Sequence, residues 1–106
     1  MTNLNDILQE LKRGLEDIYG PRLIALYLYG SRARGDAEDD SDIDVAMVLD
    51  DYESTEQERA RFSRFRAALC LEHGVLLSVT PIRVAEWRAG VGLFLRNVQR
   101  EGRRVA

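Results

Sequence analysis

Two short stretches decide how this chain folds: Gly30-Ser31-Arg32-Ala33-Arg34-Gly35 and Ser41-Asp42-Ile43-Asp44. An almost unbroken apolar run, residues 23–29, leads into the first stretch, and a second run, residues 43–49, starts within the second. The first run is bounded by Pro21 and Gly30, and its length is typical of a strand buried on both faces. The pattern predicts two strands joined by a sharp turn, a short helical piece and an acidic loop.

A helix is predicted before the first strand. Asn3 or Asn5 is the expected N-cap, and Gly20-Pro21 is a strong stop signal. Between them, apolar residues recur at helical spacing: Leu4, Ile7, Leu8, Leu11, Leu15 and Ile18.

A longer helix is predicted after the second strand. Ser54 and Gln57 form a capping box at its start, and Gly74 ends it. We expect it to bury Phe62, Phe65 and Leu69. A third strand follows over residues 75–82.

The last segment, residues 84–98, is predicted to be helical, with a break around Gly90-Val91-Gly92 and an end at Gly102. The order of elements is then helix, strand, turn, strand, helix, strand, helix. That order predicts an α/β fold, a small mixed β-sheet flanked by helices. With 106 residues the chain has room for one hydrophobic core, so residues 1–106 are expected to form a single domain.

The composition excludes several classes of protein. No stretch is long and apolar enough to span a bilayer, and the first residues lack the features of a secretory signal, so we expect a cytoplasmic protein without membrane contacts. Cys70 is the only cysteine and is expected to be a buried or half-buried helix residue. A net charge of -3 disfavours nucleic acid as a partner, although Arg59, Arg61, Arg64 and Arg66 interleave with Phe62 and Phe65; we interpret these arginines as a solvated helix face.

Asp42 and Asp44 are the first candidates for chemistry. Residues two apart in a strand point to the same face, so the two carboxylates converge and repel each other unless a cation lies between them. Oxygen ligands of this kind suit Mg²⁺ that retains waters and binds substrate phosphates. A bare Asp-x-Asp is more often part of a solvated acidic loop, and six acidic residues lie here: Asp36, Glu38, Asp39, Asp40, Asp42 and Asp44.

Gly30 and Ser31 are the second candidates. They end a strand and open a helical turn, whose first N–H groups can hold phosphate oxygens. Gly30 allows close approach of the backbone, and the Ser31 hydroxyl adds a donor. A Gly-Ser pair alone is common at ordinary turns. Next to the carboxylate pair, however, it predicts that a nucleoside triphosphate with Mg²⁺ bridges the two.

With this spacing, the combined motif resembles the signature of the minimal nucleotidyltransferases, in the DNA polymerase β-like superfamily. The resemblance implies the fold of that superfamily, a triphosphate bound by Gly30 and Ser31, and Asp42 and Asp44 as catalytic metal ligands. Arg34 either contacts phosphate or pairs with Asp36 or Asp42. The resemblance also implies ATP or another nucleoside triphosphate as substrate and a small helical HEPN-type protein as partner, with this chain as an antitoxin.

The chain departs from the family pattern at the third strand. Active members place a third carboxylate there, whereas this strand offers Ser78 or Thr80 on one face. Neither accepts a proton near neutral pH, which removes a contribution of about 10²–10⁴ in rate. Glu86, downstream, is a weaker substitute. Two interpretations follow: an enzyme that transfers a nucleoside monophosphate to an acceptor hydroxyl, or a catalytically weak or inactive module that binds nucleotide and neutralises a partner. Transfer to RNA ends or to a small molecule is a weaker third.

Two further features are interpreted as structural. His73, just before Gly74, suits the C-terminal end of a helix, where a cation is stabilised. Trp87, Phe94 and Leu95 are expected to pack the last helix against the sheet; if exposed, they mark a protein interface.

Overall fold

The computed structural model describes residues 3–35 and 42–105, and its centre is a four-stranded sheet. The strands are β1 (Leu23–Tyr29), β2 (Ile43–Leu49), β3 (Leu77–Arg83) and β4 (Arg103–Arg104), in the order β3-β2-β1-β4. β1 is antiparallel to β2 and β4, and β2 is parallel to β3. The sheet is therefore mixed, as the sequence predicts.

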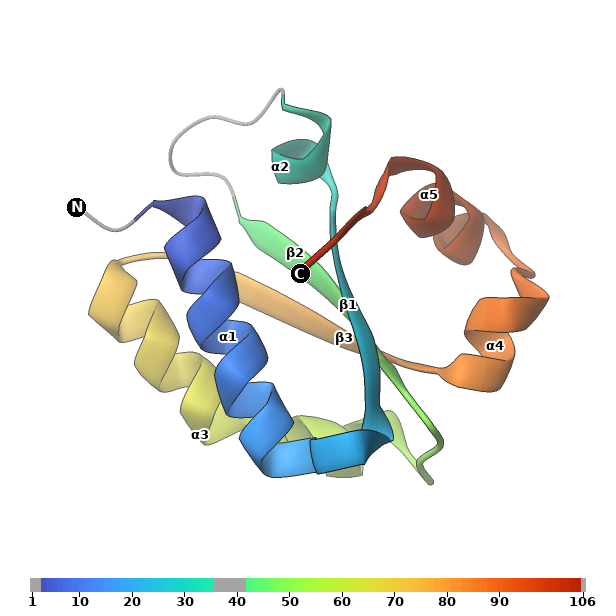
Figure 1. Ribbon diagram of the computed structural model, residues 1–106, viewed down its shortest axis with the longest axis horizontal. Helices are drawn as coiled ribbons and strands as arrows, with labels where there is room; N and C mark the ends of the chain where they lie inside the picture. The colour runs from blue at the N-terminus through green and yellow to red at the C-terminus, as the bar shows by residue number, and fades with distance from the viewer. Residues whose placement is uncertain (1–2, 36–41, 106) are drawn as a thin grey trace.

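Helices cover both faces of the sheet, with the longer pair on one side (Figure 1). α1 (Leu4–Tyr19) and α3 (Thr55–His73) lie on one face; α4 (Val84–Ala89) and α5 (Leu93–Glu101) lie on the other. A 3-10 turn, η1 (Gly20–Arg22), precedes β1, and the short α2 (Ser31–Arg34) follows it. No helix in the described residues is long and apolar enough to cross a membrane.

The main core lies between the sheet and the α1/α3 pair. It includes Leu11 and Leu15 of α1 together with Val45, Met47 and Leu49 of β2, all fully buried. A smaller cluster on the other face joins Ala46, Ile82 and Val98 to partly buried aromatic residues. β2 is thus buried on both faces.

The prediction that β1 is buried on both faces is wrong. Leu26 and Leu28 are buried, but Tyr27 and Tyr29 are half-buried and Ile24 is 43% exposed. Two causes combine: α4 and α5 are short, and β4 pairs only with Tyr27 and Leu28, so it leaves the start of β1 uncovered.

The predicted helix ends agree with the structure, whereas Ile18 does not lie on the buried face as predicted. The Asn3 side chain accepts from the Asp6 N–H at 2.9 Å, and Ser54 accepts from the Gln57 N–H at 3.2 Å, so Asn3 and not Asn5 is the first cap. Ile18 is exposed because the buried stripe of α1 continues from Leu15 to Tyr19, four residues on.

The third strand starts at Leu77, two residues later than predicted. Gly74 adopts a left-handed conformation, and the Val75 N–H then bonds back to the Cys70 carbonyl at 3.1 Å. Val75 therefore belongs to the cap of α3. The expected break at residues 90–92 is present, between α4 and α5.

Side chains occupy much of the outer edge of β3. The Ile43 N–H donates to the Leu76 carbonyl, so the even residues of β3 bond to β2 and the odd ones face outward. At the edge, Leu77 accepts from Arg66 Nη1 at 3.0 Å and donates to Cys70 Sγ at 3.3 Å. Further along, Pro81 has no N–H, and its carbonyl accepts from the Tyr52 hydroxyl at 3.0 Å.

The close contact between Gly14 of α1 and Phe65 of α3 can be tested by substitution. A Cβ at Gly14 would overlap the ring of Phe65. We expect Gly14→Ala to lower the free energy of unfolding by up to about 2 kcal/mol, because overpacking costs about 1–3 kcal/mol and the gain in helix propensity is about 1 kcal/mol. In a Phe65→Leu background the same change should be neutral or stabilising. Urea unfolding of the four proteins measures this, and equal effects in both backgrounds would contradict the packing.

Candidate functional site

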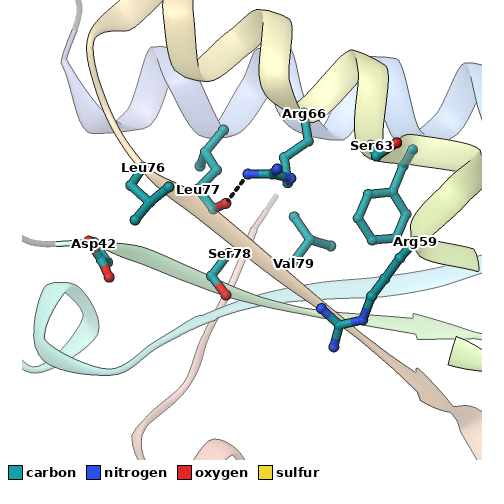
Figure 2. Close-up of a pocket in the computed structure, with 9 residues that line it drawn as sticks. Asp42, Arg59, Ser63, Arg66, Leu76, Leu77, Ser78 and Val79 are labelled. Atoms are coloured by element: carbon teal, nitrogen blue, oxygen red, sulfur yellow. Dashed lines mark hydrogen bonds between the residues drawn. The ribbon is translucent and has the colours of Figure 1, made fainter. Parts of the chain in front are cut away.

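The site is built around Asp44, which lies near the start of the central strand β2. Asp44 pairs with Tyr29, the last residue of β1, and with Ser78 in β3. Asp42 lies two residues earlier, just before β2. Figure 2 shows that the Asp42 and Ser78 side chains point to the same side of the sheet. The predicted carboxylate pair therefore faces one side, whereas Ser41 and the acidic residues at 36, 38, 39 and 40 lie outside the described residues.

Gly30 brings the predicted phosphate turn against this pair. Its φ of 77° lies in the region that favours glycine, and a Cβ there would lie 2.6 Å from Asp44 Oδ2. The Gly30 carbonyl accepts from the N–H groups of Ala33 and Arg34, at 3.1 and 3.2 Å, which closes the first turn of α2. Ser31 follows Gly30 directly and begins that helix, whose first N–H groups have no partner within the helix.

The electrostatics of Asp44 fit a cation site. Burial raises the pKa of the Asp44 carboxyl, and the neighbouring carboxylate of Asp42 raises it further. A divalent cation would relieve both effects, because it compensates the two negative charges in a partly desolvated place. Together with the space that only a glycine at position 30 leaves beside Asp44 Oδ2, the donor set fits Mg²⁺.

Ser78, one of the two residues that the sequence offers in place of a third carboxylate, pairs with Asp44 in the sheet. Thr80 lies further along β3, opposite Ala46, with its hydroxyl 3.5 Å from that of Tyr29. Of the two alternatives left open by the sequence, Ser78 is therefore the residue beside the carboxylate pair.

Glu86 does not reach the site. Its carboxylate accepts from Arg83 Nη1 at 2.8 Å, at the far end of β3. Five residues separate Arg83 from Ser78, or about 16 Å of strand. The suggestion that Glu86 substitutes for the missing carboxylate is wrong because the strand carries α4 away from the site.

Arg34 joins α2 to α5. Its Nη1 lies 3.2 Å from Glu101 Oε2, a partner that the sequence did not suggest. Asp36, one of the predicted partners, lies outside the described residues. A role for Arg34 in phosphate binding stays a prediction.

A pocket of about 310 Å³ opens beside Asp42 and Ser78, between α3 and the edge of β3 (Figure 2). Four residues of α3 line it, together with the strand and one aspartate: Asp42, Arg59, Phe62, Ser63, Arg66, Leu76, Leu77, Ser78 and Val79. The sequence pattern predicts no pocket here and favours a solvated face for the arginines of α3. For Arg66 that is wrong, since it bonds to Leu77. The spacing of residues 59, 63 and 66, which places them on one helix face, was the available signal.

The remaining predicted residues are placed as follows. Trp87 stacks on Tyr27 with ring centroids 4.5 Å apart, and Phe94 meets the edge of Tyr29 at 5.6 Å while staying 45% exposed. His73 Nε2 lies 2.7 Å from Glu10 Oε2, a contact that ties α3 to α1, as expected for a structural role. Cys70 is half-buried on α3, as expected.

The approach of Gly30 to Asp44 predicts that a methyl group added at position 30 weakens metal binding. We expect Gly30→Ala to weaken Mn²⁺ binding by about tenfold or more, because the methyl displaces the Asp44 carboxylate. Gly20→Ala is the matched control: Gly20 also has a positive φ, of 58°, but no described atom lies within 4 Å of its Cβ position. Both changes should cost about 1–2 kcal/mol in stability. Mn²⁺ titration by electron paramagnetic resonance separates them, and equal affinities would contradict the predicted metal site.

The raised pKa of Asp44 predicts that Asp44→Asn increases the free energy of unfolding, by an amount that depends on pH. When the pKa of a carboxyl is higher in the folded than in the unfolded state, the protein loses stability as the pH rises from the unfolded-state pKa to the folded-state pKa. Without metal, Asp44→Asn should therefore be more stable than the natural protein at neutral pH, and the gain should vanish below about pH 3.9, the ordinary aspartate pKa. Urea unfolding across this range measures it. Destabilisation at neutral pH would contradict the assigned electrostatics.

Comparisons with known proteins identify the family of this chain. The sequence profile described as "Polymerase beta, Nucleotidyltransferase" matches residues 9–106. A protein of Methanocaldococcus jannaschii that carries the name of a protein adenylyltransferase is 29% identical over 73 residues, 69% of this chain and 73% of the relative.

Two solved structures share the fold. A chain of a toxin–antitoxin complex crystallised with AMP-PNP superimposes with a TM-score of 0.68 at 19% identity, over 93% of this chain and 72% of the other. A chain from the complex of the tri-AMPylated HEPN toxin of Shewanella oneidensis with its MNT antitoxin gives a TM-score of 0.62 at 17% identity, over 94% and 69%. The profile match spans most of the sequence and includes the motif. The chain therefore belongs to the polymerase β nucleotidyltransferase family.

Proposed function

We propose that this chain binds ATP with Mg²⁺ and transfers AMP to a hydroxyl group of a partner protein. The observation that carries the proposal is the approach of the Gly30 turn to the Asp44 carboxylate, where a Cβ would lie 2.6 Å from Oδ2. A phosphate turn and a carboxylate pair this close suit a triphosphate and its cation together.

The chain's own groups have distinct roles in this reaction. The N–H groups at the start of α2 and the Ser31 hydroxyl bind the phosphate oxygens, and Asp42 and Asp44 would hold Mg²⁺. That ion, when bound, neutralises charge on the phosphates. The acceptor oxygen forms a bond to the α-phosphorus while the bond to the bridging oxygen breaks, and its electron pair leaves with pyrophosphate. The acceptor proton goes to water, because Ser78 cannot take it.

The nature of the partner is proposed from the relatives. Chains of toxin–antitoxin complexes share this fold, and one such complex contains a tri-AMPylated HEPN toxin with its MNT antitoxin. We propose by analogy that this chain is an antitoxin, that its acceptor is a tyrosine of a HEPN-type toxin, and that both act in the cytoplasm, where ATP is abundant.

Ser78 beside Asp44 favours a slow enzyme or a second function. Without a carboxylate there, general base catalysis worth about 10²–10⁴ in rate is lost unless another group compensates. The same observation supports the alternative that the chain neutralises its partner by contact alone, with bound nucleotide but no transfer.

Labelling of the partner decides between the two. The protein is incubated with Mg²⁺, ATP labelled at the α-phosphate, and the product of the neighbouring gene. We expect label on the partner with the natural protein, and a loss of at least about 10²-fold with Asp42→Asn, since electrostatic stabilisation of the transferred group is lost.

Asp50→Asn is the matched control, because Asp50 lies at the opposite end of β2, where it pairs with Arg22 at 3.1 Å. It should label the partner at the natural rate. Stable binding of the partner without label would favour the contact-only alternative. Label that persists in Asp42→Asn would refute the assignment of the site.

A further inference from the structure

We propose that the pocket between α3 and the edge of β3 is the acceptor subsite, and that Arg59 binds the acceptor oxygen there as an anion. The inference rests on the proposed function and assigns the side from which the acceptor enters. It also assigns a group that compensates for the carboxylate absent at Ser78.

The strand order places the pocket on the side opposite the phosphate turn. Gly30 approaches Asp44 from β1, whereas Ser78 neighbours Asp44 on β3 and lines the pocket with Asp42. Transfer of a phosphoryl group requires the attacking and leaving oxygens to lie roughly in line, on opposite sides of phosphorus. With the triphosphate held at Gly30, the acceptor has to approach from the β3 side, where the pocket lies.

The lining fits an apolar group that ends in a hydroxyl. Phe62, Leu76 and Val79 provide apolar surface, and Leu76 is 54% exposed at the mouth. Arg66 is occupied, because its guanidinium donates to the Leu77 carbonyl. Arg59 differs from it: among the described residues it has no hydrogen bond or ion pair. Figure 2 shows the Arg59 side chain extending from α3 towards β3, with its guanidinium beyond Val79 as seen from Asp42.

The charge of Arg59 suits a reaction without a strong base. A cation within about 4–6 Å lowers the pKa of an ionising group by about 1–3. A phenol, with an ordinary pKa near 10, then loses its proton to water within about two pH units of neutrality, whereas an aliphatic hydroxyl does not. A guanidinium at Arg59 thus favours the oxyanion that attacks, which a carboxylate at position 78 would oppose by repulsion.

A probe of phenol binding tests the inference without requiring transfer. The full chain is titrated with 4-nitrophenol, which ionises near neutral pH, and amide shifts are followed by nuclear magnetic resonance on both sides of that ionisation. We expect shifts at Ser63, Leu76 and Ser78, and about tenfold tighter binding of the phenolate than of the phenol, the ratio for a pKa lowered by one.

Two variants complete the design. Arg59→Gln should bind both forms equally, and Arg64→Gln, an exposed arginine of α3 outside the pocket, should keep the preference. Absent shifts, shifts only elsewhere, or a preference that survives in Arg59→Gln would overturn the inference, even if the partner is labelled. If the natural protein prefers the phenolate but no partner is labelled, the subsite assignment stands. Only the proposed AMP transfer is then contradicted.

Discussion

The pairing of Tyr29 with Asp44 is the constraint on which the rest of the site depends. It places the last residue of β1 opposite a carboxylate on the central strand, so the next residue, Gly30, turns directly over Asp44 Oδ2. A slip of one residue would turn Asp44 into the α1/α3 core and bring Val45 to the active face. Because β2 is buried on both faces, that slip would place a carboxylate among the fully buried side chains of the main core.

The same constraint makes the site unfavourable for folding stability when no ligand is bound. Two carboxylates face one side, burial raises the pKa of Asp44, and Gly30 takes a backbone conformation that other residues avoid. The compensation lies on the opposite face, where α1 and α3 pack against the sheet and bury Leu11, Leu15 and Met47. The main hydrophobic core and the Asp44 carboxylate thus lie on opposite faces of one sheet.

The sequence predicted those features whose causes are local. Asn3, Ser54 and Gly74 cap helices through neighbours within a few residues, and the turn at Gly30 with Asp42 and Asp44 forms one nearly continuous stretch. The features it missed depend on distant partners. Arg66 was assigned to solvent because its partner, Leu77, becomes a neighbour only when β3 folds against α3.

The same limit explains the other corrections. Glu101 meets Arg34 across 67 positions, which no local pattern reports. Ile18 and Tyr19 both fit an apolar helix face, and only the position of α3 decides which is buried. The choice between Ser78 and Thr80 required the register of a parallel pair, since alternation along β3 places both on one face.

The occupied edge of β3 restricts the shape of any partner that this chain serves. With Leu77 bonded to Arg66 and Cys70, and Pro81 bonded to Tyr52, little of the strand backbone is left for another strand to join. A flat sheet edge therefore has no continuous hydrogen-bonding template here. The proposed acceptor subsite therefore suits a single side chain that projects from the partner and enters between α3 and β3.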